Sequence, residues 1–281
     1  MPTVTASSGY ARGSVDDRVG PDGRGGVDDR VGPDGRGSVH DVPVRMRGAA
    51  SMTALVQMRL AAFLRTGRAL PPIIAALVVL GVIHGGGASQ AAPAYGYSAV
   101  ALFPILAWTA KLVLDTEPDV QRRLARLTVG PGREAVAGLL AAATIGLAFG
   151  AAAMLAPWPF GAIRGPEPGE PALITGFLLG ALAHLLALLA AVALGALASR
   201  AVTGTIRAGV TVLATGSVLV VVLGLSDSIA PWLVPPLMAT ARALSRQVPP
   251  ADGTFWLHTA WAGVWCAAVF TGYGWLRRRR S

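Results

Sequence analysis

The sequence predicts an all-α, polytopic membrane protein with six transmembrane helices, both termini in the cytoplasm, and a disordered N-terminal tail. Three observations carry this prediction: the overall composition, six long apolar segments, and the placement of the arginines. Hydrophobic residues make up 53% of the 281 residues and charged residues only 14%, which is too apolar for a soluble domain of this length. We therefore expect lipid to be the solvent for most of the chain.

Residues 1–50 form a polar, Gly-rich tail with no apolar run, and they contain an internal repeat of period 12. Residues 14–25 read SVDDRVGPDGRG, residues 26–37 read GVDDRVGPDGRG, and a third copy begins directly afterwards. Each copy offers only two valines, too few for stacked repeats to bury a core. The composition predicts disorder. Met46 and Met52 are alternative starting points for translation.

Residues 51–68 follow the tail and are predicted to form an amphipathic helix on the inner membrane surface. Apolar residues recur at helical spacing between basic ones, with Leu55, Met58, Ala62 and Phe63 set against Arg59, Arg65 and Arg68. An amphipathic extension of the first membrane span is the alternative for the same pattern.

Residues 69–280 form the predicted membrane domain, in which each span needs about 20 apolar residues. The six segments are Leu70–Gly87, Tyr95–Leu114, Ala135–Ala156, Ala172–Ala198, Ala208–Leu225 and Phe255–Leu276. Only Lys111, near the end of the second segment, is charged within them. A charge at the bilayer centre is unfavourable by about 2.5–3.5 kcal/mol, so this scarcity is expected.

The basic residues outside the repeat tail set the orientation, because cytoplasmic loops carry an excess of Lys and Arg. Sixteen fall on the predicted inner side, at Arg45, Arg47, Arg59, Arg65, Arg68, Lys111, Arg122, Arg123, Arg126, Arg133, Arg200, Arg207 and Arg277–Arg280. Three fall outside, at Arg164, Arg242 and Arg246. The net charge of +9 is thus explained by membrane topology, and no separate basic domain indicates nucleic-acid binding.

Residues that could carry enzymatic chemistry are scarce. The chain has no GxxxxGK[ST] phosphate loop, no GxSxG or HExxH motif, and a single cysteine, Cys266. We therefore predict no catalytic residues, no metal site and no bound cofactor. The acids nearest the spans are Asp115, Glu134 and Asp227, which lie at span ends or in loops and give little support for ion coupling.

His184 is the one ionisable side chain deep inside a predicted span. A neutral imidazole bonded to a neighbouring helix is the simpler interpretation, and a contact along a substrate path is the alternative. Two GxxxG pairs, Gly146/Gly150 and Gly176/Gly180, predict close helix packing within the bundle.

The loop from Asp115 to Arg133 predicts a short amphipathic helix on the cytoplasmic side. Thr116 and Asp119 suit its N-terminal cap, and Glu117 and Pro118 suit its first turn, whereas Gly130-Pro-Gly132 ends it. The helix has an apolar stripe of Val120, Leu124 and Leu127, and three basic residues off that stripe, Arg122, Arg123 and Arg126. Basic residues that only fix the topology are the alternative explanation.

The stretch from Ile229 to Leu244, between the fifth and sixth segments, is too apolar for an ordinary loop and too broken by proline to span. We expect it to dip into the outer leaflet or to cover the bundle.

From Met52 to Arg280, this pattern resembles the ABC type-2 transporter permeases, in particular actinobacterial members. Four points match: an amphipathic helix before the first span, six spans with both ends inside, a coupling helix after the second span, and short outer helices between the fifth and sixth. Short stretches of sequence, such as Glu117-Pro-Asp-Val-Gln-Arg-Arg-Leu and Trp232-Leu-Val-Pro-Pro236, are also similar. The repeat tail lies outside the family pattern, and the Arg-, Ala- and Gly-rich composition is typical of a high-GC genome.

The resemblance implies one half of a homodimeric or heterodimeric permease in a bacterial plasma membrane, most plausibly an exporter. ATP would be bound by a separate cytoplasmic ATPase subunit, which would explain the missing phosphate loop, and that subunit would dock on the coupling helix. Two alternatives remain at this stage: an ion-coupled secondary transporter, and a non-transporting membrane anchor or assembly protein.

Overall fold

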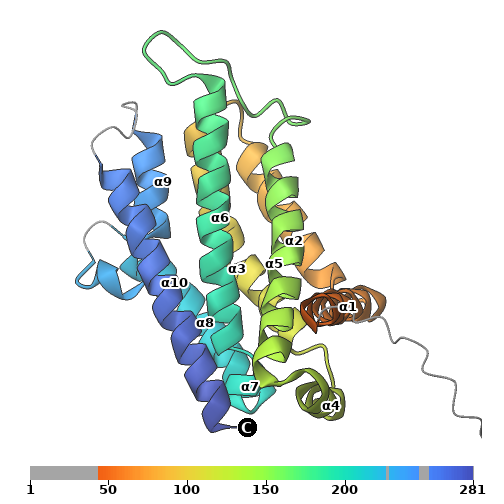
Figure 1. Ribbon diagram of the computed structural model, residues 1–281. Coiled ribbons are helices and arrows are strands. Elements are labelled where there is room, and N and C mark those ends of the chain that lie inside the picture. The colour runs from red at the N-terminus through yellow and green to blue at the C-terminus, as the bar shows by residue number, and fades with distance from the viewer. Residues whose placement is uncertain (1–43, 226–227, 247–252, 281) are drawn as a thin grey trace, which may run out of the picture. The chain divides into compact units, whose positions relative to one another are not determined.

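The computed structural model describes residues 44–225, 228–246 and 253–280, and these residues are mainly helical, with a long loop at residues 156–172 and one isolated bridge between Ser89 and Ile163 (Figure 1). The tail repeats lie outside the described residues. The first helix, α1 (Val44–Arg65), begins within the stretch that the sequence assigns to the tail. Residues 44–50 contain helix-forming Ala, Met and Arg and no proline, so they can continue the helix.

Each of the six predicted segments is a helix. They are α2 (Leu70–His84), α3 (Ala91–Leu114), α5 (Pro131–Leu155), α6 (Leu173–Leu197), α8 (Ile206–Leu223) and α10 (Thr254–Arg279). Shorter helices fill the connections: α4 (Asp119–Val129), α7 (Arg200–Thr203), the 3-10 turn η1 (Pro231–Leu233) and α9 (Leu237–Ser245).

Four of the described helices are long and apolar enough to cross a membrane: α3, α5, α6 continued through α7, and α8. A fifth span results if Met52–Arg65 and α2 are counted together, although a bend of 78° separates them. The other two predicted spans fall short for different reasons: α2 alone has 15 residues, and α10, with 26 residues, carries Thr, His, Gly and Tyr among its apolar residues. The fold is that of an all-helical membrane protein with four to five candidate spans.

The bend between α1 and α2 occurs at residues 66–69, where Gly67 adopts φ = 69°, a left-handed conformation that favours glycine. Because the helix axis turns by 78° here, α1 is not a straight extension of the first predicted span. Its buried Phe63 and Arg59 face the rest of the bundle, whereas Met58 and Leu64 are exposed.

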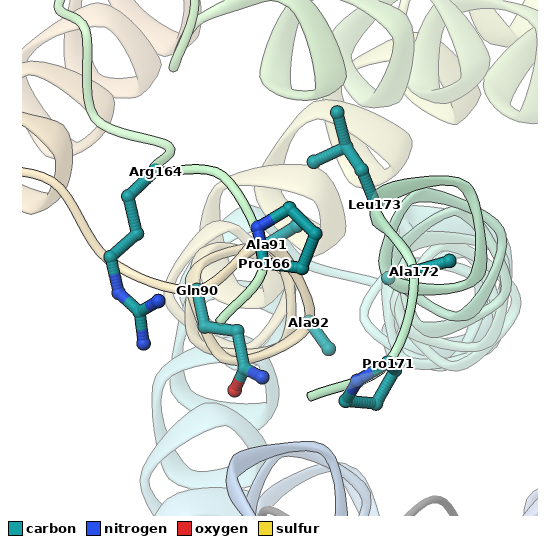
Figure 2. A pocket seen from close by; sticks show the side chains of 9 residues that line it. Gln90, Ala91, Ala92, Arg164, Pro166, Pro171, Ala172 and Leu173 are labelled. Carbon is teal, nitrogen blue, oxygen red and sulfur yellow. The ribbon is translucent and has the colours of Figure 1, made fainter. Parts of the chain in front are cut away.

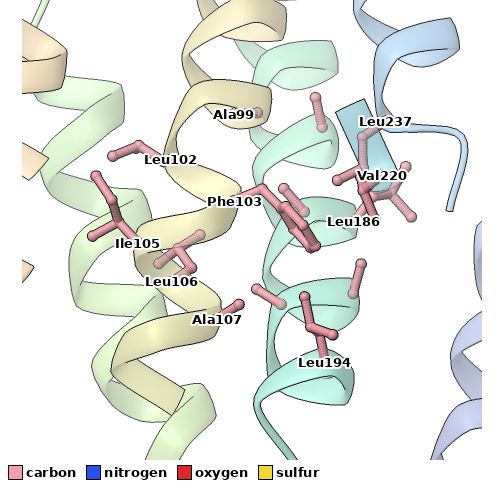
Figure 3. Close-up of a cluster of buried hydrophobic side chains, with 14 of the residues drawn as sticks. Ala99, Leu102, Phe103, Ile105, Leu106, Ala107, Leu186, Leu194, Val220 and Leu237 are labelled. Carbon is pink, nitrogen blue, oxygen red and sulfur yellow. The ribbon is translucent and has the colours of Figure 1, made fainter. Parts of the chain in front are cut away.

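The centre of the bundle is the contact between α3 and α6, and small residues make it close. Side chains of Phe103, Leu106, Leu186 and Leu194 fill the space between the two helices and their neighbours (Figure 3). Gly180 of α6 faces Tyr95 of α3 so closely that a Cβ atom there would overlap the tyrosine. The Gly176/Gly180 pair therefore does serve helix packing, as its spacing predicts.

The apolar stretch after α8 folds back onto the bundle. In α9, Leu237, Thr240, Ala241 and Leu244 are buried, and Ala241 and Leu244 pack against Gly96 of α3. The second half of the predicted stretch therefore covers the bundle, whereas Ile229 and Trp232 in its first half are exposed.

Candidate functional site

The predicted amphipathic helix in the loop between α3 and α5 is present as α4, at the end of the bundle where α7 and the last turn of α10 also lie (Figure 1). Gly130, with φ = 89°, ends the helix where the sequence predicts. The predicted cap was wrong. The Thr116 hydroxyl donates to the Leu112 carbonyl oxygen at 2.7 Å, and α4 starts after Pro118 with no side-chain cap.

One face of α4 is apolar and points away from the bundle. Val120, Leu124 and Leu127 keep 69%, 57% and 84% of their surface exposed, although they are the apolar stripe of the helix. Arg123 is also exposed. An exposed apolar stripe of this kind on a short helix suits either a partner protein or the surface of a bilayer.

The opposite face of α4 is bound to the bundle by two of its arginines. Arg122 is buried, and its guanidinium donates to the carbonyl oxygens of Leu114 and Glu117 at 3.4 and 3.5 Å. Arg126 pairs with Glu134 of α5 at 3.5 Å. Arg122 and Arg126 thus lie off the apolar stripe, but they do not project outward with Arg123. They point to the other side of the helix, where acids and carbonyl groups of the same chain face them.

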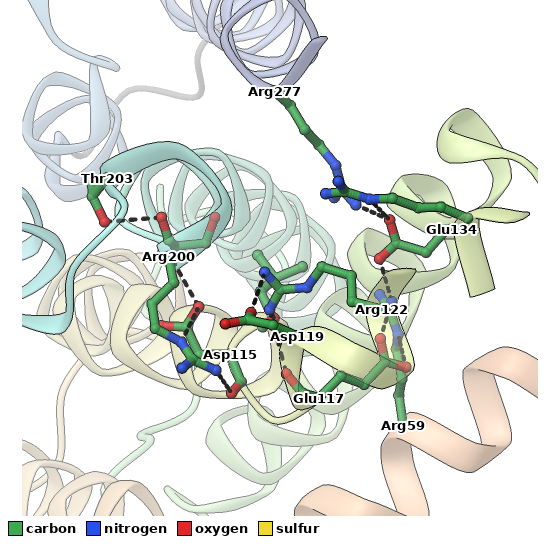
Figure 4. A network of polar contacts seen from close by, with 12 residues as sticks. Arg59, Asp115, Glu117, Asp119, Arg122, Glu134, Arg200, Thr203 and Arg277 are labelled. Carbon is green, nitrogen blue, oxygen red and sulfur yellow. Dashed lines mark hydrogen bonds and ion pairs between the residues drawn. The ribbon is translucent and has the colours of Figure 1, made fainter. Parts of the chain in front are cut away.

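Glu134 is the centre of this charged cluster, with only 1% of its surface exposed (Figure 4). It accepts a hydrogen bond from Arg59 of α1 at 2.6 Å, pairs with Arg126 of α4, and contacts Arg277 of α10. Arg59 also forms a two-pronged pair with Glu117, at 2.7 and 2.6 Å. Four helices, α1, α4, α5 and α10, thus meet at one carboxylate.

A glycine makes room for this arrangement. Gly138 lies one helical turn after Glu134, and a Cβ atom at Gly138 would overlap the Arg59 guanidinium. The missing side chain is what allows α1 and α5 to approach closely enough for Arg59 to reach Glu134.

A second cluster forms around Asp115, at the end of α3. Its carboxylate accepts a hydrogen bond from Lys111 at 2.6 Å and one from the backbone N–H of Arg200 at 2.8 Å. The Arg200 side chain also donates to the Asp115 carbonyl oxygen at 3.1 Å. Asp115 therefore ties α3 to the start of α7, and it neutralises the one charge found inside a predicted span.

The arginines of α4 and α7 crowd one another. The pKa of Arg122 is lowered first by burial and also by the nearby charges of Arg200 and Arg126, whereas Asp119 and Asp115 oppose this shift. Buried ions are costly to desolvate, and this cost is offset only when each ion is paired. The cluster is therefore sensitive to the loss of any single carboxylate.

His184 has partners on its own helix and on the neighbouring one. Its Nδ1 lies 2.9 Å from the Gly180 carbonyl oxygen and its Nε2 lies 3.3 Å from the Ser98 hydroxyl of α3. A groove of about 220 Å³ between α5 and α6 also reaches this side chain. The contacts agree with the simpler interpretation of a histidine bonded to a neighbouring helix, and the groove leaves the substrate contact as a prediction.

At the opposite end of the bundle, the space beside the loop that precedes α6 is small. Arg164, Gln90 and Pro166 surround a cavity of only about 10 Å³ above the starts of α3 and α6, roughly the room that one water molecule needs (Figure 2). Among the described residues, no three His, Cys, Asp or Glu side chains are grouped so that they could hold a metal ion.

Sequence reasoning located α4 and its stripe but missed the charged clusters behind it. Lys111 and Asp115 are spaced i,i+4 on one helix turn, which is a readable signal for their pair.

Comparison with known proteins adds no assignment: the chain matches no protein-family model, no curated protein and no solved structure.

Proposed function

We propose that this chain is the membrane-spanning permease subunit of an ATP-driven ABC transporter, that it works as an exporter, and that a separate cytoplasmic ATPase subunit binds the ATP. The observation that carries the proposal is the two-sided character of α4. Its apolar stripe is exposed, and its opposite face is ion-paired to the bundle.

A helix with these two faces suits the transmission of force. Val120, Leu124 and Leu127 would insert as anchors into a groove of the ATPase, in the manner of amphipathic helices that bind hydrophobic grooves. On the other face, Arg126 connects α4 to Glu134, and through it to Arg59 of α1 and Arg277 of α10. A displacement of α4 by the partner would therefore pull directly on α1, α5 and α10.

The topology that fits this function has six spans with both termini in the cytoplasm of a bacterial cell. Beside the four candidate helices, α2 and α10 would supply the first and sixth spans, and α1 would lie along the inner surface after the 78° bend. The 15 residues of α2 reach about 22 Å, so the bilayer must thin locally or the glycines after α2 must lie within it. Reporters fused after Ser281 and inserted at Glu167 should read as cytoplasmic and external, respectively.

The permease half would pair with a second copy or a related chain. Only 11% of the apolar window of α8 is buried, against 72% for α3, so one side of the bundle is left for lipid or another permease half. His184 beside the α5–α6 groove is the residue that we would examine first for substrate contact.

The test is Leu124→Asp in the purified chain, assayed with the ATPase encoded beside this chain's gene. Losing a buried anchor typically costs 2 kcal/mol or more in binding, so we expect affinity to fall at least about 30-fold. Transport and substrate-stimulated ATP hydrolysis should be lost with it.

Two variants make the test specific. Gln121→Asp adds the same charge to an exposed position of α4 beside the stripe, and it should weaken binding much less. Arg123→Ala removes a rim charge, worth about 1 kcal/mol or less, and its effect should shrink in high salt because salt screens exposed charges. If Leu124→Asp binds the ATPase normally, or if no neighbouring ATPase gene exists, α4 is a helix that lies on lipid. That result would support the alternative of a non-transporting membrane anchor.

A further inference from the structure

A large cationic cavity lies beside α4, next to Leu127 at the end of its apolar stripe. It has a volume of about 720 Å³ and is open to solvent. Five arginines line it, with a single carboxylate, and these residues are Arg122, Arg123, Arg126, Arg200, Arg280 and Asp119. The formal charge of the charged lining is thus +4.

The cavity is lined by α4, the first residue of α5, α7 and the end of α10. Three of its arginines are held in place: Arg122 by the carbonyl oxygens of Leu114 and Glu117, Arg126 by Glu134, and Arg200 by Asp115 (Figure 4). Arg123 and Arg280 are exposed and have no ion pair with any residue in the described ranges. The site therefore combines fixed donors with two that are free to close on a ligand.

The charges in this cavity repel one another. Asp119 lies 3.5 Å from Arg122 but is 70% exposed, so it offsets little of the positive charge. Repulsion from Arg200 and Arg126 contributes to the lowered pKa of Arg122. An anion placed among these side chains would relieve the repulsion, and the planar fork of a guanidinium is well matched to phosphate oxygens.

We propose that this cavity binds a phosphate-bearing anion. Its volume exceeds what a bare phosphate needs and leaves room for a phospholipid headgroup. Basic pockets at the cytoplasmic ends of membrane helices are suited to anionic headgroups, and a soluble phosphate compound would meet the same arginines. The bound anion would bridge α4 to α7 and α10, so it would fix the orientation of α4 relative to these helices. This inference does not depend on the ABC assignment.

The experiment uses the full chain in detergent and in nanodiscs. Native mass spectrometry measures retention of phosphatidylglycerol against phosphatidylcholine, which carries a phosphate but no net charge. Thermal unfolding with added inorganic phosphate or pyrophosphate, against chloride at matched ionic strength, measures the soluble source. The test variant is Arg123→Gln/Arg280→Gln, which leaves the ion pairs of Glu134 and Asp115 intact. The matched control is Arg133→Gln/Arg278→Gln, which removes two exposed arginines near the same end but outside the cavity.

Each basic residue near a membrane surface contributes about fivefold to the binding of anionic lipid, so we expect the test variant to lose roughly 30-fold and the control only a few-fold. Selective retention of phosphatidylglycerol would identify the lipid as the source. A rise in unfolding temperature with phosphate or pyrophosphate alone would identify a soluble anion. The proposal is overturned if neither anion binds better than its reference, or if the two double variants bind equally.

Discussion

Midway along the bundle, α3 and α6 meet through alanines, glycines and a few large apolar side chains, whereas at the α4 end the helices meet through ion pairs centred on Glu134 and Asp115. The difference arises because lipid provides no hydrophobic driving force between helices. Lipid tails are as apolar as leucine, so apolar burial alone does not select one arrangement of helices, and close backbone approach must supply the specificity. At the α4 end, charged groups with defined partners supply it instead.

The two regions should therefore respond differently to substitution. The apolar centre should tolerate changes that keep its volume, and respond to added atoms. The charged end should tolerate nothing that leaves an arginine unpaired. The predictions below test this contrast, from the largest expected effect to the smallest.

Glu134→Ala should have the largest effect on stability. It leaves Arg59, Arg126 and Arg277 without their shared carboxylate, and breaking a buried pair by removing one partner typically costs about 3–5 kcal/mol. Unfolding of the purified chain by titration with SDS measures this loss. The control is Glu167→Ala, which removes a carboxylate that is 67% exposed and pairs with Arg164 on the surface. Its effect should lie within experimental error. A loss below about 1 kcal/mol for Glu134→Ala would mean that water already solvates the cluster.

Gly180→Ala should have an intermediate effect. The added methyl group would overlap Tyr95 and push α3 away from α6, and overpacking of this kind typically costs about 1–3 kcal/mol. The control is Gly150→Ala, the second glycine of the other GxxxG pair, where an added Cβ meets no atom within 4 Å. Equal stability of the two variants in the same SDS titration would show that α3 and α6 are not in close contact at Gly180.

The helices were readable from the sequence because their length and apolarity are properties of single segments. Each predicted segment coincides with a helix, and α4 was found from its stripe and from Gly130. The number of spans was harder to predict. Composition alone does not decide whether a helix of only 15 residues, such as α2, or a helix with polar residues among its apolar ones, such as α10, crosses the membrane.

The charged clusters were not readable in the same way. Arg59 reaches Glu117 and Glu134 across 58 and 75 residues of sequence, so their pairing depends on how α1 packs, which no local pattern encodes. Glu117 looked like a first-turn helix residue because its type suits that position. The structure turns it toward Arg59 instead, since a buried arginine needs a carboxylate more than an exposed helix end does.

The smallest effect is expected at the far end of the bundle, where Arg164 pairs with Glu167 and Glu170 in the loop between α5 and α6. Glu170 accepts hydrogen bonds from Arg164 and from the backbone N–H of Glu167 at 2.9 Å, and these lower its pKa below the ordinary 4.5. A lowered pKa in the folded state stabilises the loop above that ordinary value, and the contribution is lost as pH falls through the folded pKa. Between pH 7 and 5.5 the stability of the loop should therefore not change.

NMR titration of side-chain-labelled glutamate in nanodiscs measures the pKa of Glu170 directly, with Glu170→Gln to assign the signal. Arg164→Gln should raise the pKa of Glu170 toward 4.5, whereas Arg133→Gln, at the other end of α5, should leave it unchanged. Because Arg164 is one-third exposed and the pair holds a loop outside the bundle, neither variant should alter global unfolding, in contrast to Glu134→Ala. An unchanged Glu170 pKa in Arg164→Gln would mean that water, and not Arg164, holds this carboxylate, and the buried half of the Arg164 pairing would then be absent at the far end.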